Sequence, residues 1–130
     1  MNRNAKCKGL RRVELTIPVA NELGDVAQRT VTAWVDKRYP DLAIQEAWEL
    51  LPVEQWEVTH VASGRIVARL PSEATARAAL APLSKLLDWT QPAEAIVPAE
   101  PGEWRWLKQR IAMIVERIKA EHGENPRNAA

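Results

Sequence analysis

Two short runs in the middle of the chain alternate strictly between apolar and polar residues, and this pattern constrains the fold most. The runs cover residues 56–60 and 66–70, and Ala62, Ser63 and Gly64 lie between them. Alternation with a period of two is typical of a strand that buries one face. Gly64 can adopt the positive φ that a three-residue hairpin loop requires. We therefore expect a β-hairpin over residues 55–70.

A third alternating run lies near the N-terminus. Val13, Leu15 and Ile17 are separated by Glu14 and Thr16. The run predicts a strand over residues 12–18, which the proline at position 18 ends. Together with the hairpin, this strand predicts a small antiparallel sheet packed by helices, an α+β fold.

Helical spacing predicts the helices that cover this sheet. From residue 22 to 37 the apolar residues recur at helical intervals, with Asn21 placed to cap the start. Residues 41–51 fit both a helix and a strand, and their propensity favours a helix. Ser72 begins a further helix that ends near Asp88 and is kinked or restarted at Pro82. The apolar positions of the first segment are Leu23, Val26, Ala27, Val31, Trp34 and Val35.

Composition divides the chain of 130 residues into five parts. Residues 1–11 form a basic flexible arm, and residues 12–90 form the α+β domain. Residues 91–102 are rich in Pro, Ala and Glu, which indicates an extended connector. Residues 103–122 form an additional amphipathic helix, and residues 123–130 are expected to be a disordered tail.

The C-terminal helix has an apolar seam. Its apolar residues recur at alternating steps of three and four, and such a seam either docks on its own domain or pairs with another chain. Trp104 and Trp106 lie about 200° apart around a helix, so at least one of them should reach a second surface. The candidate protein interface consists of Trp104, Trp106, Leu107, Ile111, Ile114 and Ile118.

The net charge of +1 hides an uneven distribution. Residues 1–12 carry five basic groups and no acid, whereas residues 13–102 carry a net charge of −6. A phosphate backbone would be repelled by such a body, so nucleic acid would have to contact the arm. The candidate nucleic-acid contacts are Arg3, Lys6, Lys8, Arg11 and Arg12.

The expected order of a helix, hairpin strands and an Ala-rich helix resembles that of double-stranded-RNA-binding domains, most closely from Val58 to Leu87. That resemblance would imply RNA binding at the start of the last helix. The family has lysines there, whereas this chain carries Ser72, Glu73 and a single basic residue, Arg77, within six positions. The departure lowers the weight of the nucleic-acid interpretation.

Groups that could carry out catalysis are sparse. His60 and Ser63, with Asp88 as an orienting acid, form the one set worth testing for nucleophilic catalysis, but His60 is expected on the same strand face as Trp56 and is better interpreted as structural. Two carboxylate pairs, Glu54 with Glu57 and Glu46 with Glu49, are expected to be solvated. Neither a zinc-binding spacing nor a glycine-rich phosphate loop is present. We expect no enzyme, cofactor or metal.

These features favour a non-enzymatic protein-protein interaction or assembly module, such as a small accessory or inhibitory protein. Its partner would be another protein or a second copy. Three of the six tryptophans, Trp34, Trp48 and Trp56, are expected in the core. The lone Cys7 and the lack of a long apolar run indicate a cytoplasmic protein without a membrane segment. The alternative is nucleic-acid binding by the basic arm.

Overall fold

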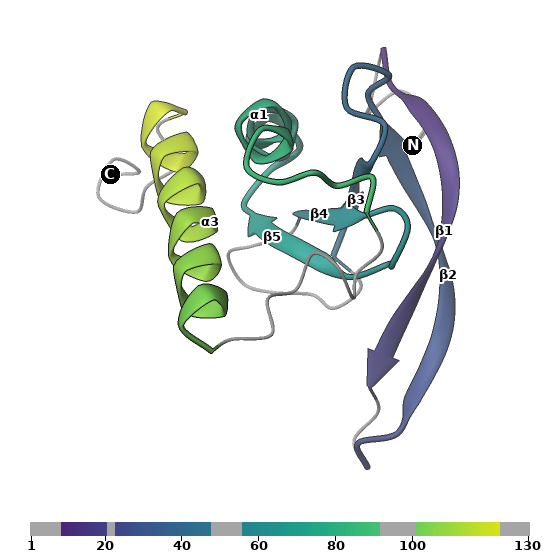
Figure 1. The fold of residues 1–130 in the computed structure, drawn as a ribbon. Helices are drawn as coiled ribbons and strands as arrows, with labels where there is room; N and C mark the ends of the chain where they lie inside the picture. The colour runs from purple at the N-terminus through teal and green to yellow at the C-terminus, as the bar shows by residue number, and fades with distance from the viewer. Residues whose placement is uncertain (1–8, 21–22, 48–55, 92–100, 123–130) are drawn as a thin grey trace.

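A computed structural model describes residues 9–20, 23–47, 56–91 and 101–122 (Figure 1). The five strands form one antiparallel sheet in the order β1-β2-β3-β4-β5, which confirms the expected α+β fold and shows a larger sheet than three strands. The elements are β1 (Arg11–Ala20), β2 (Val26–Val35), β3 (Leu42–Glu46), β4 (Trp56–His60), β5 (Ile66–Leu70), α1 (Glu73–Ser84) and α3 (Pro101–Glu121).

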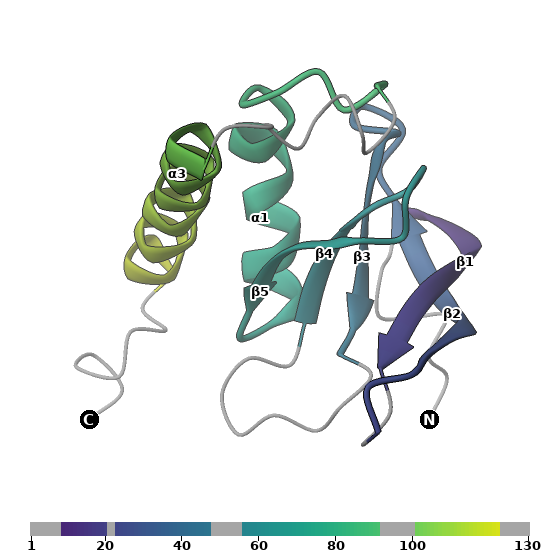
Figure 2. The ribbon, with the colours of Figure 1, turned by 60° about the horizontal axis from the view of Figure 1, so that its bottom comes forward.

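Both helices lie on one side of the sheet, and the β1–β2 hairpin lies on the other side of the molecule (Figures 1 and 2). α1 packs on β3, β4 and β5, and α3 packs on α1 and β5. β1 and β2 pair along ten residues each, whereas β2 meets β3 where Trp34 lies opposite Ile44. The long hairpin is therefore joined to the rest of the sheet near one end of β2.

The prediction of a helix over residues 22–37 is wrong, because β2 occupies most of this segment. Five of the ten residues of β2 are Val or Thr, whose branched side chains favour strands. Val31 pairs with Leu15 and Ala33 pairs with Val13 across the hairpin. Leu23, the first residue of the expected helical stripe, is 86% exposed at the hairpin tip. Because this expected helix is a strand, the observed element order does not match that of double-stranded-RNA-binding domains.

Two further strand predictions need correction. β1 continues through Pro18 to Ala20, since an edge strand tolerates the missing N–H of proline. The helical preference at residues 41–51 is also overruled, because residues 42–46 form β3 between β2 and β4. Burial of Leu42 and Ile44 in the core outweighs the local propensity. Residues 48–51 lie outside the described residues.

The hairpin predicted over residues 55–70 is confirmed as β4 and β5. Gly64 adopts a φ of 73° in the connecting turn. A Cβ at this position would collide with the main-chain oxygen of Thr16 in β1. Glycine thus allows both the turn and its close approach to the β1–β2 hairpin.

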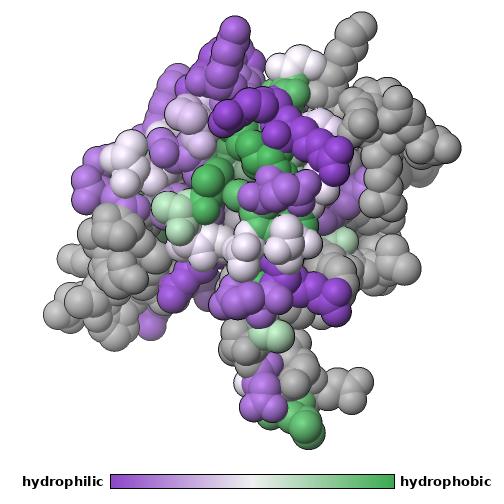
Figure 3. Space-filling view, turned by 90° about the vertical axis from the view of Figure 1, so that its right-hand side faces the viewer, coloured by the Kyte–Doolittle hydropathy of each residue, from purple (hydrophilic) through white to green (hydrophobic). Residues whose placement is uncertain are grey.

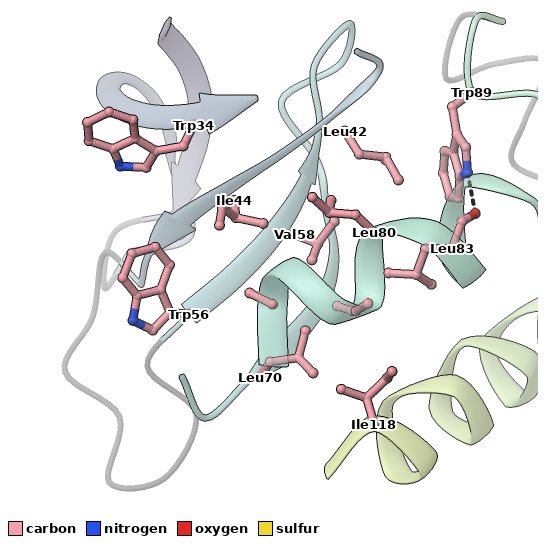
Figure 4. Close-up of a cluster of buried hydrophobic side chains, with 13 residues drawn as sticks. Trp34, Leu42, Ile44, Trp56, Val58, Leu70, Leu80, Leu83, Trp89 and Ile118 are labelled. Carbon is pink, nitrogen blue, oxygen red and sulfur yellow. Dashed lines mark hydrogen bonds between the residues drawn. The ribbon is translucent and has the colours of Figure 1, made fainter. Parts of the chain in front are cut away.

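Between the sheet and the helices lies the main hydrophobic core (Figure 4). Trp34 and Trp56 are buried in it as predicted, and Trp48 lies outside the described residues. Ser72 caps α1 as expected: its Oγ accepts from the Thr75 N–H at 3.1 Å. The helix contains Pro82 and ends at Ser84, earlier than predicted. Further core residues are Leu42, Ile44, Val58, Leu70, Leu80, Leu83, Trp89 and Ile118.

A smaller hydrophobic cluster is built mainly by β1 and β2. Leu15 and Ile17 pack there with Ala33 and Val35 of β2 and with Ala43 of β3. Figure 3 faces this side of the molecule and shows hydrophobic residues at its centre with hydrophilic residues around them. The alternation of β1 therefore does bury one face, as the sequence indicated, but against its own hairpin rather than against a helix.

Candidate functional site

The inner side of α3 belongs to the core of the same chain. Leu107 is 3% exposed and Ile118 is buried in the core, while Ile111 and Ile114 are half-buried and pack against it. The helix rests on α1 and β5. Four of the six residues predicted as a protein interface thus contact their own domain.

Trp106 lies on the other side of α3, where it is 54% exposed. Met113 is 63% exposed and follows seven residues later, almost in line with Trp106 along the helix axis. The guanidinium of Arg110 lies 5.9 Å from the centroid of the Trp106 ring, which is a cation–π distance. We call Trp106, Arg110 and Met113 the outward face of α3.

The two tryptophans of α3 were predicted to lie on different sides of the helix. Trp106 is exposed, whereas the side chain of Trp104 lies outside the described part of the structure, so their relative placement stays a prediction. The apolar periodicity selected the inner residues, because a seam of branched aliphatic residues is the stronger pattern. It did not select Met113, which lies within the apolar run 111–115 but outside the repeat of three and four.

The basic residues near the outward face lie around Trp106, and the nearest described acid, Glu116, lies three residues after Met113. Residues 105–115 include Arg105, Lys108 and Arg110 and no acidic residue. Ion pairs occur further along the helix, between Arg117 and Glu121 at 3.0 Å and between Lys119 and Glu116 at 3.7 Å. No carboxylate among the described side chains lies within ion-pair distance of Arg105 or Arg110.

The predicted nucleic-acid contacts are only partly described. Arg3, Lys6 and Lys8 lie outside the described residues, and Arg11 and Arg12 are exposed at the start of β1. Arg12 forms an ion pair with Glu14 at 3.4 Å. A Cβ on Gly9 would lie 3.9 Å from Nη2 of Arg77. The fold therefore brings one further guanidinium, from α1, next to the arm.

The ring of His60 is 3% exposed, and both of its nitrogens form hydrogen bonds. Nε2 lies 2.7 Å from the carbonyl oxygen of Trp89. Because a carbonyl oxygen only accepts, Nε2 donates its proton to Trp89, and Nδ1 lies 2.9 Å from the Ser63 hydroxyl oxygen. The Trp89 indole N–H in turn donates to the Leu83 carbonyl at 2.7 Å, the bond drawn in Figure 4.

These bonds join β4 to the segment that follows α1, which supports the structural interpretation of His60. The expected orienting group was wrong, because the Trp89 carbonyl occupies the place given to Asp88. Asp88 instead accepts from the Thr90 hydroxyl, and this bond, with a weaker one from Gln91, lowers the pKa of its carboxyl.

The expectation of solvated carboxylates fails at Glu57. Its side chain is 3% exposed on the sheet face opposite the main core. The Arg69 guanidinium donates to Oε2 at 3.0 Å, and the Gln45 amide donates to Oε1 at 3.4 Å. A buried carboxylate needs such partners, and here the neighbouring strands β3 and β5 provide them. Glu46 is exposed as expected, and Glu49 and Glu54 lie outside the described residues.

Within the described ranges, no three His, Cys, Asp or Glu side chains gather in a way that could hold a metal ion. No described helix is both long and apolar enough to cross a membrane. Comparisons with protein-family models, curated proteins and solved structures gave no match to this chain. The outward face of α3 is therefore proposed as the candidate site from the exposure and charge of its residues, without support from a related protein.

Proposed function

We propose that this chain is a non-enzymatic protein-protein interaction module whose contact surface is the outward face of α3. The observation that carries the proposal is the exposure of Trp106, which is 54% although the same helix buries Leu107 beside it. Exposed tryptophan and arginine side chains are the residues most enriched at interaction hot spots. A small accessory or inhibitory protein would use such a face.

The division of α3 into two sides supports this choice of surface. The inner residues pack in or against the core of their own domain, so they are not available to contact a second chain while α3 is docked. Trp106 and Met113 remain, and their large apolar side chains gain most from coverage by a partner. The single cysteine, Cys7, supports a reducing compartment such as the cytoplasm as the place of this function.

Selection of binding peptides tests this proposal. A random peptide library is selected on the full chain, and each recovered peptide is measured by fluorescence anisotropy. We expect Trp106→Ala/Met113→Ala to weaken the recovered peptides by at least about tenfold, as loss of a hot spot does. Leu23→Ala and Ile66→Ala are matched controls, since both side chains are exposed hydrophobics outside α3.

The control variants should change the affinity by less than about twofold. Peptides that bind the double variant as tightly as the original chain would refute the proposal. Point variants are preferable to a truncation at Gln91, because removal of α3 would take Ile118 out of the main core and uncover the residues against which Ile111 and Ile114 pack. Circular dichroism of each variant establishes that it is folded.

A second candidate function is nucleic-acid binding by the basic arm. The observation in its favour is the position of Arg77 beside Gly9, which places a guanidinium of α1, itself paired with Glu73 at 3.4 Å, next to the arm. Binding to an oligonucleotide should then fall steeply with salt and disappear when residues 1–12 are deleted. Binding that survives the deletion would refute this candidate.

A further inference from the structure

Cations lie on both sides of the apolar strip formed by Trp106 and Met113. At about 100° per residue, Met113 lies about 20° from Trp106 around the helix axis, Arg110 about 40° to one side and Arg105 about 100° to the other. Both arginines are exposed. Arg110 and Arg105 therefore lie on the two sides of the strip at its Trp106 end. At its Met113 end, Glu116 lies on the same side as Arg105 and is paired with Lys119 at 3.7 Å.

These two guanidinium groups have no carboxylate at ion-pair distance among the described residues. Arg117 and Lys119, further along α3, are paired with Glu121 and Glu116. Arg105 and Arg110 can therefore form ion pairs with an acidic group of another molecule. A guanidinium prefers carboxylate or phosphate oxygens, which it can bind with two parallel hydrogen bonds.

We propose, on the basis of the proposed function, that the occupant of the outward face is an acidic amphipathic helix of another protein. Its apolar side chains would pack on Trp106 and Met113, and its carboxylates would pair with Arg105 and Arg110. The strip spans seven residues, about 10 Å along α3, which matches apolar positions i, i+3 or i+4, and i+7 of a partner helix.

The apolar character of the strip favours a protein over a nucleic acid. Met113 is 63% exposed and offers a flexible thioether surface, which suits apolar side chains and not a phosphate backbone. The basic groups of residues 105–115 are also spread around the helix, since Lys108 lies about 160° from Trp106. A phosphate backbone would engage only part of them.

Three synthetic peptides test the inference. Each is a short amidated helix with leucines on one face, and the flanking positions are Glu, Gln or Lys. We expect the full chain to bind the Glu peptide about tenfold more tightly than the Gln peptide, with the difference shrinking at high salt. Arg105→Glu/Arg110→Glu should reverse the preference in favour of the Lys peptide. The control Arg65→Glu, at an exposed arginine in the turn between β4 and β5, should leave it unchanged.

The outcomes separate this inference from the function on which it rests. Equal affinity for the Glu and Gln peptides, with loss of both in Trp106→Ala/Met113→Ala, would overturn the acidic partner and keep the interaction surface. If library peptides and designed peptides alike bind without dependence on Trp106, both ideas fall.

Two further measurements address the other occupants. A single-stranded oligonucleotide that binds more tightly than the Glu peptide and depends on Trp106 would overturn the inference. So would a dimer seen by light scattering that Trp106→Ala abolishes, since a second copy would then cover the face. A monomeric chain that prefers the Glu peptide supports it.

Discussion

Trp89 and Trp106 occupy opposite environments although both lie at the edges of the segments that the sequence defines. Trp89 is 6% exposed, and its indole N–H is bonded to the carbonyl of Leu83 at the end of α1. Trp106 is 54% exposed, and its contact is the guanidinium of Arg110 on the same helix. One tryptophan closes the core, and the other presents an apolar surface to solvent.

The difference shows how tertiary packing assigns a role to a residue type. The last carbonyls of a helix need donors from outside its regular hydrogen-bond pattern, and Trp89 supplies one donor to Leu83, beside the Leu86 N–H, while filling the core. Ile118 of α3 lies in the main core and Leu107 is buried, whereas Trp106 stays exposed. Burial predicts a role in stability for Trp89, and exposure predicts a role in binding for Trp106.

The largest expected effect is that of Trp89→Ala. Removal of the buried indole leaves a cavity and takes away one donor to the Leu83 carbonyl, which keeps the Leu86 N–H at 3.1 Å. The free energy of unfolding should therefore fall by about 3–5 kcal/mol, mostly through the cavity. Urea unfolding followed by circular dichroism measures this change. Trp89→Phe, which retains most of the volume, should cost less. A loss below about 1 kcal/mol for the alanine variant would show that the segment after α1 does not close the core.

Leu107→Ala should have the next largest effect on stability, because Leu107 is the most buried residue of α3 among those described. We expect a loss of about 2–4 kcal/mol in the free energy of unfolding. Met113→Ala on the opposite side of the same helix is the matched control and should change it by less than about 0.5 kcal/mol. Equal effects of the two substitutions in thermal unfolding would contradict the docking of α3.

His60→Ala should lower the free energy of unfolding by about 1–3 kcal/mol, since it leaves the Trp89 carbonyl without its donor. Ser63→Ala should cost less, because the half-buried hydroxyl site is accessible to water. Amide hydrogen exchange in residues 85–91 should accelerate in His60→Ala. Unchanged exchange in this segment would argue that His60 does not hold it.

Asp88→Asn should have a smaller effect that depends on pH. The hydrogen bond from Thr90, followed by that from Gln91, holds the pKa of Asp88 below its ordinary value of 3.8. The ionised form therefore stabilises the fold above pH 3.8, and this contribution is lost as the pH falls through the lowered pKa. The stability difference between the two proteins should vanish in acid. Titration of the Asp88 carboxyl by NMR would contradict this if its midpoint lay above 3.8.

Trp106→Ala should have the smallest effect on folding. A half-exposed side chain on the outside of a helix contributes little packing, and alanine has a higher helix propensity, so we expect a change within about 0.5 kcal/mol. Differential scanning calorimetry measures it. A loss of stability as large as that of Leu107→Ala would mean that Trp106 packs as a core residue. It would contradict the contrast between Trp89 and Trp106.

Local patterns were sufficient for the elements whose signals do not compete. The hairpin, the Ser72 cap and the C-terminal helix were predicted because alternation, capping chemistry and helical spacing each pointed to one structure. The segment over β2 was misassigned because its apolar residues satisfy both periods. The burial of Glu57 was missed because its partners, Gln45 and Arg69, come from neighbouring strands.

The sequence predicted only part of the candidate site. Periodicity identified α3 as the helix that needs a surface, and the angle between Trp104 and Trp106 indicated two directions. It did not indicate which side the domain itself would cover. That choice depends on how α3 packs on α1 and β5 and places Ile118 in the core, which no local pattern contains.

The sequence by itself determined that this chain forms an α+β domain with one strongly amphipathic helix at its C-terminus, because these features follow from the spacing of apolar residues along the backbone. Only the tertiary structure decided that residues 26–35 are a strand, that Glu57 is buried and that Trp106 faces outward. Each of these depends on contacts between residues far apart in the chain, and such contacts override local preference when they bury more apolar surface or satisfy more polar groups.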